Sequence, residues 1–332
     1  MDTSRQTTNQ HLQDAQDTRP VVGRFAPTPS GRMHLGNVFS CLMAWLSARS
    51  AGGRMIMRVE DLDPRAHNRA AATLLMEDLQ WLGLDWDEGP YYQSDRSEAY
   101  AAALAVLDDR GLTYPCFCTR AELHAATAPH ASDGTYIYQG TCRGLTPEEI
   151  AERSLRRPPS TRIAVPDADD QDGTIRFFDL GYGWQQETLA CDCGDFLLCR
   201  SDGVIAYQLA VVVDDTEMGV TQVVRGRDLL GSAARQIWLA NELGGKAPEF
   251  GHVPLLIAPD GRRLSKRERD LDMGALRERF GRPEPLLGML ASAVGFAEVG
   301  EPISAVNLVS RFSWETLRAH RDDVVVSDGV LV

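Results

Sequence analysis

The chain has 332 residues, of which 43% are hydrophobic and 24% are charged, and its formal net charge is −13. A chain of this length can bury a substantial core, and its composition is that of an ordinary globular enzyme. No apolar run approaches the roughly 20 residues that span a bilayer, and the negative charge disfavours nonspecific binding to a polyanion. We therefore expect a soluble protein without a membrane partner.

The N-terminal residues do not have the pattern expected of a secretory signal. Residues 1–20 are polar, rich in Gln, Thr and Asp, and lack the apolar stretch of a secretory signal, which predicts a disordered extension and a cytoplasmic protein. The seven cysteines are an odd number. Without an export signal they favour reduced thiols, some of them bound to metal, over a disulfide framework.

A strand, a loop and a helix open the ordered part of the chain. Residues 21–25 predict a short strand, and the prolines and glycine of the following APTPSGR forbid its continuation. Apolar side chains then recur at helical spacing over residues 35–46, and Gly52 ends that pattern like a C-terminal cap. A second strand over residues 55–59 stops at the acidic turn 60–63. This βαβ unit should place its ligand site at the carboxyl ends of the strands.

His34, Gly36 and Asn37 stand where the first helix begins. The unpaired N–H groups and the positive end of a helix dipole at such a place favour a bound phosphate, and Gly36 would let a nucleotide approach closely. Taken alone, a histidine before a helix is more often a cap or a surface residue. The surrounding motifs have to decide between these interpretations.

Three motifs, RFAPTPSGRMHLGN, RVEDLDPR and LGLDWDEGPYYQSDR, resemble in this order the class I aminoacyl-tRNA synthetases of the glutamyl type. The resemblance implies that His34 and its helix hold ATP. It also implies a glutamate site made of Arg24, Phe25, Ala26, Pro27, Thr28, Glu60, Tyr207 and Arg225. The charges agree, because a buried amino acid needs a cation such as Arg24 for its carboxylate and an anion such as Glu60 for its ammonium.

The α/β pattern is interrupted after a helix that we predict over residues 97–107. Three thiolates and a phenol then offer a closed four-ligand site: Cys116, Cys118, Tyr138 and Cys142. His124 and His130 are alternatives for the fourth ligand, and the competing interpretation is that Cys116 and Cys118 are small core residues. Structural zinc would contribute folding energy to this small lobe. The resemblance supports zinc, because the glutamyl-queuosine branch of the family holds it through three cysteines and a tyrosine here.

The rest of the inserted segment is less specific. We place Cys191, Cys193 and Cys199 in a strand, outside the metal site. The basic stretch 153–162 (RSLRRPPSTR) is a candidate nucleic-acid face, with a solvated loop as the alternative. The resemblance implies that this lobe grips tRNA, with Arg153, Arg156, Arg157 and Arg162 as candidates for phosphate contacts.

The second half of the site is predicted from another apolar pattern. Residues 204–215 (VIAYQLAVVVDD) are rich in β-branched side chains, which predicts a buried parallel strand ending in two carboxylates. Residues 221–226 predict the next strand, and residues 229–243 a helix. Tyr207 and Arg225 would then lie at or near strand positions. Arg225 could clamp the distal carboxylate of glutamate bidentately and so select against glutamine.

A short strand over residues 254–257 leads into a basic loop that resembles the second signature of the family, in which a mobile lysine-bearing loop closes over ATP. The implied ATP contacts are Arg263, Leu264, Ser265, Lys266 and Arg267, and the implied catalytic residues are His34 and Lys266. Adenylate formation builds negative charge on the α-phosphate, which an ammonium, helix amides and Mg²⁺ stabilise. Two positions depart from the pattern, since Asn37 replaces the final His of the first signature and Arg263 the first Lys of the second.

We predict a Rossmann-like doubly wound parallel sheet with an inserted zinc-bearing lobe and a small helical C-terminal region that includes a helix over residues 286–294. The expected divisions are an extension at 1–20, the first half of the catalytic domain at 21–115, the inserted lobe at 116–200, the second half at 201–260, and the signature loop with the helical region at 261–332.

The resemblance covers nearly all of the chain, and only 66 residues follow Lys266. We therefore expect no large anticodon-reading domain, which points to the short relatives that activate glutamate without tRNA and transfer it to the queuosine base of tRNA(Asp). The alternatives are a truncated glutamyl-tRNA synthetase that charges the 3′ end, and an inactive tRNA- or amino-acid-binding protein. We expect ATP, L-glutamate and tRNA(Asp) carrying queuosine as partners, structural Zn²⁺ and Mg²⁺ with ATP as cofactors, and a monomer.

Overall fold

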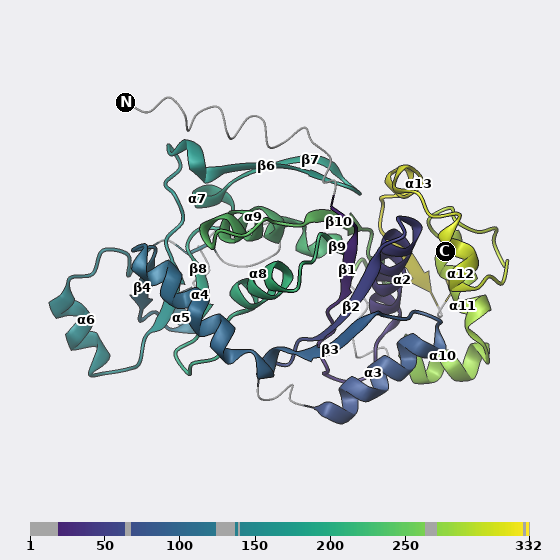
Figure 1. The fold of residues 1–332 in the computed structure, drawn as a ribbon, viewed down its shortest axis with the longest axis horizontal. Coiled ribbons are helices and arrows are strands. Elements are labelled where there is room, and N and C mark those ends of the chain that lie inside the picture. The colour runs from purple at the N-terminus through teal and green to yellow at the C-terminus, as the bar shows by residue number, and fades with distance from the viewer. Residues whose placement is uncertain are drawn as a thin grey trace.

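The structure is a computed structural model that describes residues 19–63, 68–123, 137–138, 140–262, 271–327 and 330–331. It is elongated, with a small lobe around one end and the C-terminal helices at the other (Figure 1). Among the described residues, no helix has both the length and the apolar character needed to cross a membrane.

A mostly parallel sheet forms the centre. Its strands, in spatial order, are β3 (Glu88–Tyr92), β2 (Arg54–Val59), β1 (Val22–Phe25), β9 (Gln222–Gly226), β10 (Glu249–Val253), β6 (Thr174–Asp179) and β7 (Gly183–Thr188). Only the β6–β7 hairpin is antiparallel. The backbone N–H of Thr221, just before β9, donates to Val22 O at 3.0 Å and joins the two halves of the sheet. The chain proceeds outward from β1 through β2 to β3 on one side and from β9 to β10 on the other, which is the order of a doubly wound sheet; the earlier β6–β7 hairpin is added beyond β10.

Helices cover both faces of the sheet. One face carries α2 (Leu35–Ser50), α3 (Arg69–Trp81), α10 (Met273–Phe280), α11 (Pro283–Ser292), α12 (Ala305–Val309) and α13 (Trp314–Ala319), and the other carries α4 (Ser97–Asp109), α8 (Tyr207–Glu217) and α9 (Ala233–Glu242). The alternation of strand side chains divides the core, since Met55 and Met57 join the first cluster whereas Ile56 joins the second. The predicted α/β fold with a parallel sheet is therefore confirmed.

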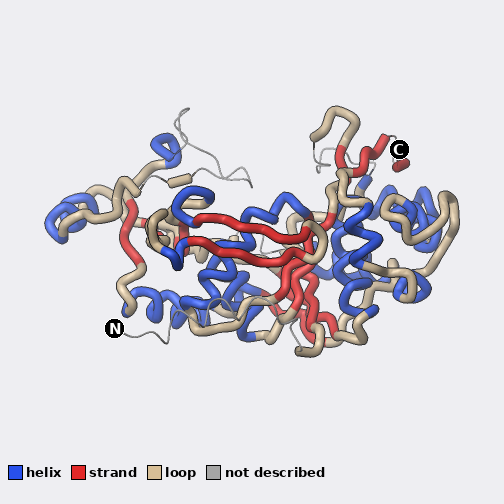
Figure 2. The backbone as a smooth tube through the Cα atoms, turned by 90° about the horizontal axis from the view of Figure 1, so that it is seen from above, coloured by secondary structure: helices blue, strands red, loops and turns tan. Residues whose placement is uncertain are grey.

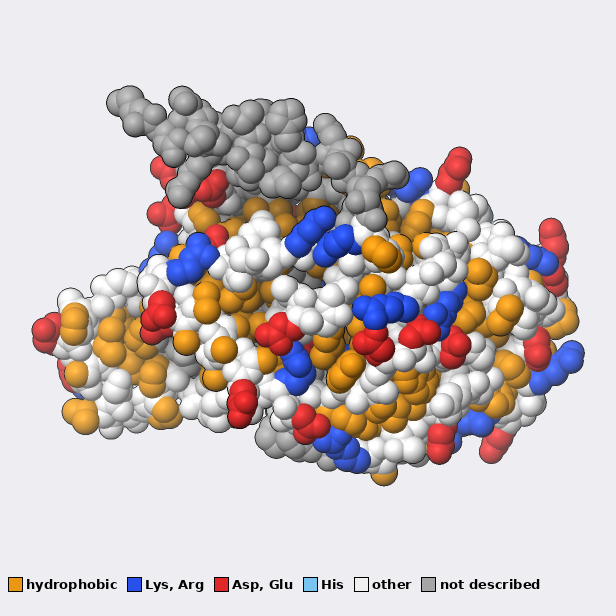
Figure 3. All heavy atoms as spheres, viewed as in Figure 1, with side chains coloured by type: hydrophobic (Ala, Val, Ile, Leu, Met, Phe, Trp, Pro, Cys, Tyr) orange, Lys and Arg blue, Asp and Glu red, His pale blue; other side chains and the backbone are white. Residues whose placement is uncertain are grey.

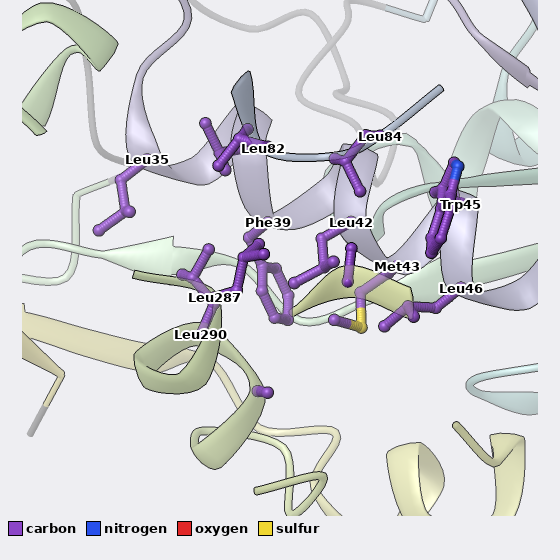
Figure 4. Packing of buried hydrophobic residues seen from close by; sticks show 14 of the residues in the cluster. Leu35, Phe39, Leu42, Met43, Trp45, Leu46, Leu82, Leu84, Leu287 and Leu290 are labelled. Carbon is purple, nitrogen blue, oxygen red and sulfur yellow. The ribbon is translucent and has the colours of Figure 1, made fainter. Parts of the chain in front are cut away.

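Helix α2 is the centre of the first core. Its apolar residues point toward Leu287 and Leu290 of α11, and Leu82 and Leu84 close the cluster from the loop after α3 (Figure 4). The helix ends where predicted, because Gly52 adopts a φ of +66° that side chains other than glycine disfavour. The C-terminal helices thus belong to the same core as α2.

The inserted lobe has its own small sheet. Its elements are β4 (Thr113–Cys116), α5 (Arg120–Leu123), α6 (Pro147–Ser154), β5 (Ser160–Ile163), the 3₁₀ turn η3 (Gln171–Gly173), α7 (Leu189–Asp192) and β8 (Phe196–Cys199). Strand β5 pairs antiparallel with both β4 and β8. Helix α6 begins with a capping box between Thr146 and Glu149 and carries a proline at its start. The long β6–β7 hairpin, seen from above in Figure 2, returns the chain to the main sheet.

The remaining elements are short. They are the 3₁₀ turns η2 (Gln93–Asp95) and η4 (Arg227–Ser232) and the strands β11 (Leu256–Ile257), β12 (Val324–Ser327) and β13 (Val330–Leu331). The strand predicted over residues 254–257 is therefore only two residues long. Strand β12 pairs parallel with β11 and antiparallel with β13.

The strand predicted over residues 204–215 is wrong. Residues 204–215 do not form a strand, because helix α8 begins at Tyr207 and continues to Glu217. Its middle, Leu209 to Val213, is buried at every position. A helix packed on all sides has no polar face, so its periodicity cannot distinguish it from a buried strand. Tyr207 consequently lies at the start of a helix and not on a strand.

Candidate active site

A cavity of about 600 Å³ opens at the carboxyl ends of β1 and β9, where the winding of the sheet reverses. It brings together eleven predicted residues from distant parts of the chain: Arg24, Phe25, Ala26, Pro27, Thr28, His34, Gly36, Asn37, Glu60, Tyr207 and Arg225. The whole predicted glutamate set and the first part of the predicted ATP set therefore line one cavity.

The floor of the cavity holds an ionic cluster. Arg58, which is completely buried, donates from Nη1 to Asp215 Oδ1 at 2.6 Å and from Nη2 to Glu60 Oε1 at 3.3 Å. Arg24 is 5% exposed, and its Nε lies 3.5 Å from Asp215 Oδ1. Burial disfavours the charge of Arg58, but Asp215, Glu60 and Asp214 hold its pKa above the ordinary value. Arg58 therefore anchors the carboxylates beneath the site.

Glu60 follows strand β2 and is 12% exposed. Its backbone N–H donates to Pro27 O at 2.9 Å, which fixes it beside the loop after β1. Burial raises the pKa of Glu60, and the opposing charges of Arg58 and Arg24 limit that rise. A carboxylate in this position is well suited to an ammonium group, because such a ligand would replace the water that burial has removed.

Arg225, near the end of β9, supplies the opposite charge. It is 6% exposed, and its Nη1 donates to Gln236 Oε1 at 2.9 Å and to the Tyr207 hydroxyl at 3.4 Å. Its Nη2 donates to Leu229 O at 3.1 Å. Burial lowers the pKa of Arg225, and the nearby charge of Arg24 acts in the same direction. The site thus presents a desolvated cation to whatever occupies the cavity.

The N-terminus of α2 forms another wall. His34 precedes the helix in an extended conformation, and its side chain does not cap the first turn. A Cβ at Gly36 would lie 3.3 Å from the imidazole of His34, so a larger residue would crowd that ring. Gly36 and Asn37 of the first turn line the cavity, so the N-terminus of the helix and the positive end of its dipole lie at this wall.

The other predicted ATP residues, Arg263 to Arg267, lie outside the described part of the chain, and with them the predicted catalytic Lys266. The chain on both sides of this segment is close to the cavity. Leu256 lines it, and Asp272 forms an antiparallel bridge with His34. Met273 also donates its N–H to Met33 O at 2.9 Å.

A second cluster lies in the inserted lobe. The sulfur atoms of Cys116, Cys118 and Cys142 all lie within 4.8 Å of one another. The Tyr138 hydroxyl is 3.5 Å from the sulfurs of both Cys116 and Cys118, and the sulfurs of Cys118 and Cys142 are 3.7 Å apart. The four predicted metal ligands thus converge, whereas the alternatives His124 and His130 lie outside the described residues.

Two predictions for this lobe need correction. Arg162 is 8% exposed; its guanidinium lies 4.0 Å over the ring of Tyr138 and donates to Asp195 O, so it cannot reach a phosphate on the surface. Cys191 lies in helix α7 and Cys193 ends it, whereas Cys199 ends strand β8. The predicted strand across these three cysteines therefore exists only over Phe196–Cys199, and of the three only Cys199 lies on it.

Several residues of the site escaped the sequence analysis. Arg58, Asp179 and His252 are buried charged or titratable side chains within or at the end of strands. Arg58, inside the apolar strand RMIMRV, gave the one signal in the sequence. A charged side chain is rarely buried without a partner, so its position indicates an ion pair in the core. Nothing in the sequence indicates that Asp179 and His252 meet, because 73 positions separate them.

Comparison with known proteins agrees with this geometry. Residues 20–319 match the family model of the class I tRNA synthetases (E and Q), catalytic domain. The glutamyl-Q tRNA(Asp) synthetase of Symbiobacterium thermophilum is 49% identical over 304 residues, which cover 88% of this chain and 92% of that protein. The protein of the same name from Nitratidesulfovibrio vulgaris is 46% identical and covers 90% and 93%.

A solved structure shows the same fold. A glutamate tRNA ligase from Elizabethkingia meningosepticum, determined in complex with its amino acid, is 26% identical and superposes with a TM-score of 0.73 over 93% of this chain and 67% of that one. The chain therefore belongs to the class I tRNA synthetases of the E and Q type, within the branch of the glutamyl-Q tRNA(Asp) synthetases.

Proposed function

We propose that this chain is an ATP-dependent ligase that activates L-glutamate as its adenylate without tRNA and transfers the glutamyl group to the queuosine base of tRNA(Asp). The observation that supports it best is the cavity, whose lining brings Glu60, Arg24 and Arg225 together with the first turn of helix α2. Glutamate carries one ammonium and two carboxylates, so its charges complement this set.

We assign the amino acid as follows. Glu60 takes the ammonium, Arg24 attracts the α-carboxylate, and Arg225 with Tyr207 takes the side-chain carboxylate. The Nε of Arg24 makes no hydrogen bond to any described residue, although it is buried. An anionic ligand would supply the missing acceptor. The remaining predicted contacts, Phe25 to Thr28, would shape the wall around the bound amino acid.

We assign ATP to the opposite wall. The first turn of α2, with His34, Gly36 and Asn37, would hold its phosphates, and residues 263–267 would reach them from a segment whose two ends flank the cavity. An α-carboxylate oxygen of glutamate then forms a bond to the α-phosphorus while the bond to pyrophosphate breaks. Lys266 would stabilise the negative charge of that step, and Mg²⁺ bound with ATP would add charge neutralisation.

We assign a structural Zn²⁺ to Cys116, Cys118, Tyr138 and Cys142. A tetrahedral ion with Zn–S bonds of about 2.3 Å and a Zn–O bond of about 2.0 Å separates two sulfurs by about 3.8 Å and a sulfur from an oxygen by about 3.5 Å. The distances in the lobe, 3.7 Å between Cys118 and Cys142 and 3.5 Å from Tyr138 to two sulfurs, fit this geometry. The guanidinium of Arg162 against the tyrosine ring would offset the negative charge of the centre.

We assign the tRNA phosphates to the basic stretch around helix α6. Arg153, Arg156 and Arg157 remain the candidate phosphate contacts, and Arg156 is bonded to Glu152. On the face shown in Figure 3, cationic and acidic side chains are interspersed, and hydrophobic side chains gather on the lobe at the end formed by α6. The cytoplasmic location, the monomeric state and the five expected divisions of the chain also stay predictions.

Pyrophosphate exchange into ATP tests the activation step. We expect exchange with glutamate, without tRNA, and at least about a hundredfold less with glutamine or aspartate, because those ligands leave buried charges without partners. Strict dependence on tRNA would favour a truncated conventional synthetase. No exchange with any amino acid would favour an inactive binding protein.

Acceptor identity needs a second assay with labelled glutamate. We would compare tRNA(Asp) carrying queuosine with the same tRNA carrying guanosine, each with and without its 3′-terminal adenosine. Transfer that requires queuosine and survives loss of the adenosine is the expected result. Transfer that requires the adenosine and ignores queuosine would overturn the assignment of the acceptor.

A further inference from the structure

Three buried side chains form a line that leads away from the cavity. Arg225 Nε donates to His252 Nε2 at 3.0 Å, and His252 Nδ1 lies 2.5 Å from Asp179 Oδ2. The three residues come from β9, β10 and the end of β6, which are adjacent in the sheet, and His252 pairs directly with Arg225 in the register. Asp179 and His252 are completely buried, so the contacts are shielded from water.

The donors and acceptors in this line permit one arrangement of protons. An arginine Nε always carries hydrogen and can only donate, so His252 Nε2 must accept and cannot carry a proton. The ring proton is therefore on Nδ1 and is donated to Asp179. Burial lowers the pKa of His252, and together with the charge of Arg225 it outweighs the hydrogen bond to Asp179, which acts in the opposite direction. The histidine is thus neutral and held in a single tautomer.

Asp179 is itself fixed by the backbone. Its Oδ1 accepts the N–H groups of Gly181 and Tyr182 at 2.9 Å and that of His252 at 3.2 Å. The turn packs tightly against His252, because a Cβ at Gly181 would lie only 2.0 Å from His252 O. The carboxylate therefore has one orientation, with Oδ2 directed at the histidine ring.

Arg225 forms no ion pair with a carboxylate of any described residue, because its partners are His252, Tyr207, Gln236 and Leu229 O. Of the five N–H groups of the guanidinium, one on Nη2 has no acceptor among these residues, and the bond to Tyr207 is long at 3.4 Å. A carboxylate in direct contact would compete with a substrate carboxylate for these groups. The neutral imidazole avoids this, because it orients the guanidinium without neutralising it.

We infer that Asp179 and His252 are positioning residues that aim Arg225 at the side-chain carboxylate of the substrate and thereby set the preference for glutamate over glutamine. The inference rests on the proposed function, in which Arg225 binds that carboxylate. A ligand with a neutral amide leaves the guanidinium buried and uncompensated, whereas glutamate supplies the missing charge.

Asp179→Asn is the most direct test. Its Oδ1 can still accept the three backbone N–H groups, but its amide nitrogen then faces His252 Nδ1. The ring must accept there and carry its proton on Nε2, opposite the Nε–H of Arg225. We expect the KM for glutamate in pyrophosphate exchange to rise roughly ten- to hundredfold, the KM for ATP to stay within about twofold, and the preference for glutamate over glutamine to fall.

Two substitutions of the histidine separate its two bonds. His252→Gln can place an acceptor where Nε2 lies, so we expect it to keep most of the affinity for glutamate. His252→Asn can reach only Asp179 and should behave like Asp179→Asn. His320→Gln is the matched control, because His320 is an exposed histidine at the end of α13. It should leave the KM values for glutamate and ATP unchanged.

The tautomer can be observed without any activity. In ¹⁵N-histidine-labelled wild-type protein, the signals that disappear in His252→Gln should be those of a neutral ring protonated on Nδ1, and a ring protonated on Nε2 would overturn the inference. The inference would also be overturned if Asp179→Asn and His252→Asn raised the KM values for glutamate and for ATP equally, or raised neither of them. In these cases, glutamate-dependent exchange by the wild type would still support the proposed function. Loss of glutamate-dependent exchange in the wild type itself would instead refute the proposed function and this inference with it.

Discussion

At the scale of single residues, the site balances buried charges that the bound amino acid would complete. Glu60 is held beside Arg58 and Arg24, and Arg225 is held by neutral groups. Arg24 and Glu60 could be predicted from the motifs that contain them, and Arg225 from the family resemblance. The sequence could not predict Arg58, Asp179 or His252 as parts of the site, since their roles arise only from contacts between distant strands.

The raised pKa of Glu60 predicts an acid limit for glutamate binding. Burial raises the pKa of Glu60, so its carboxylate is protonated at a higher pH than an ordinary glutamate, and its attraction for an ammonium is lost as the pH falls through that raised pKa. We expect the KM for glutamate, measured by pyrophosphate exchange, to rise on the acid side while the KM for ATP changes less.

Glu60→Gln is the control for this pH dependence. It should raise the KM for glutamate by roughly tenfold or more at neutral pH, because a charged hydrogen-bond partner is lost, and the acid rise should disappear. A variant that keeps the wild-type pH profile would show that another group titrates.

At the scale of elements, helix α8 explains why a strand was wrongly predicted over residues 204–215, and it supplies two carboxylates to the buried ionic cluster. An apolar run with β-branched residues is compatible with a buried strand and with a buried helix. Only its packing against the rest of the protein decides which of the two forms. As a helix, α8 places Asp214 and Asp215 on its last turns, where they meet Arg58 of β2. Asp214 also accepts from Gln93, Arg96 and Tyr100. The helix is thereby bonded to the strand that leads to Glu60.

This buried network predicts a large cost for removing its cation. Arg58→Met leaves Asp214, Asp215 and Glu60 without their shared partner, and we expect the free energy of unfolding to fall by about 3–5 kcal/mol. Arg54→Met, on the same strand but in an exposed pair with Glu88, should change it by less than about 1 kcal/mol. Urea unfolding followed by tryptophan fluorescence measures both, and equal effects would contradict a structural role for the cluster.

At the scale of the whole molecule, the structure divides into unequal cores. The C-terminal helices share one core with α2, whereas the inserted lobe has a small cluster around Cys116, Phe117, Tyr138 and Cys142. The α/β fold could be predicted from motif order, but the joint between β1 and β9 and the packing of the C-terminal helices against α2 could not. No local pattern reveals that Trp314 packs within 2.3 Å of the place a Cβ would take at Gly251.

This division predicts a local response to metal removal. Purified protein should contain about one zinc per chain, and a chelator should raise hydrogen exchange in residues 113–118 and 140–154 while α2 and α11 stay protected. Cys142→Ser should reproduce both effects, and Cys191→Ser, on an exposed thiol, should cause neither. Absence of zinc with all thiols reactive in the folded protein would contradict the metal assignment.

The joint between β1 and β9 also bears on how the protein is made. Val22 donates its N–H to Thr221 Oγ1 at 2.8 Å across 199 positions of the chain. At about 5–20 residues per second, a ribosome needs on the order of 10–40 s to supply the second strand after the first. During that interval one edge of β1 has no partner, and neither Arg225 nor His252 exists. Glutamate therefore cannot assist the early folding of the nascent chain, which depends on its own βαβ unit until the later strands arrive.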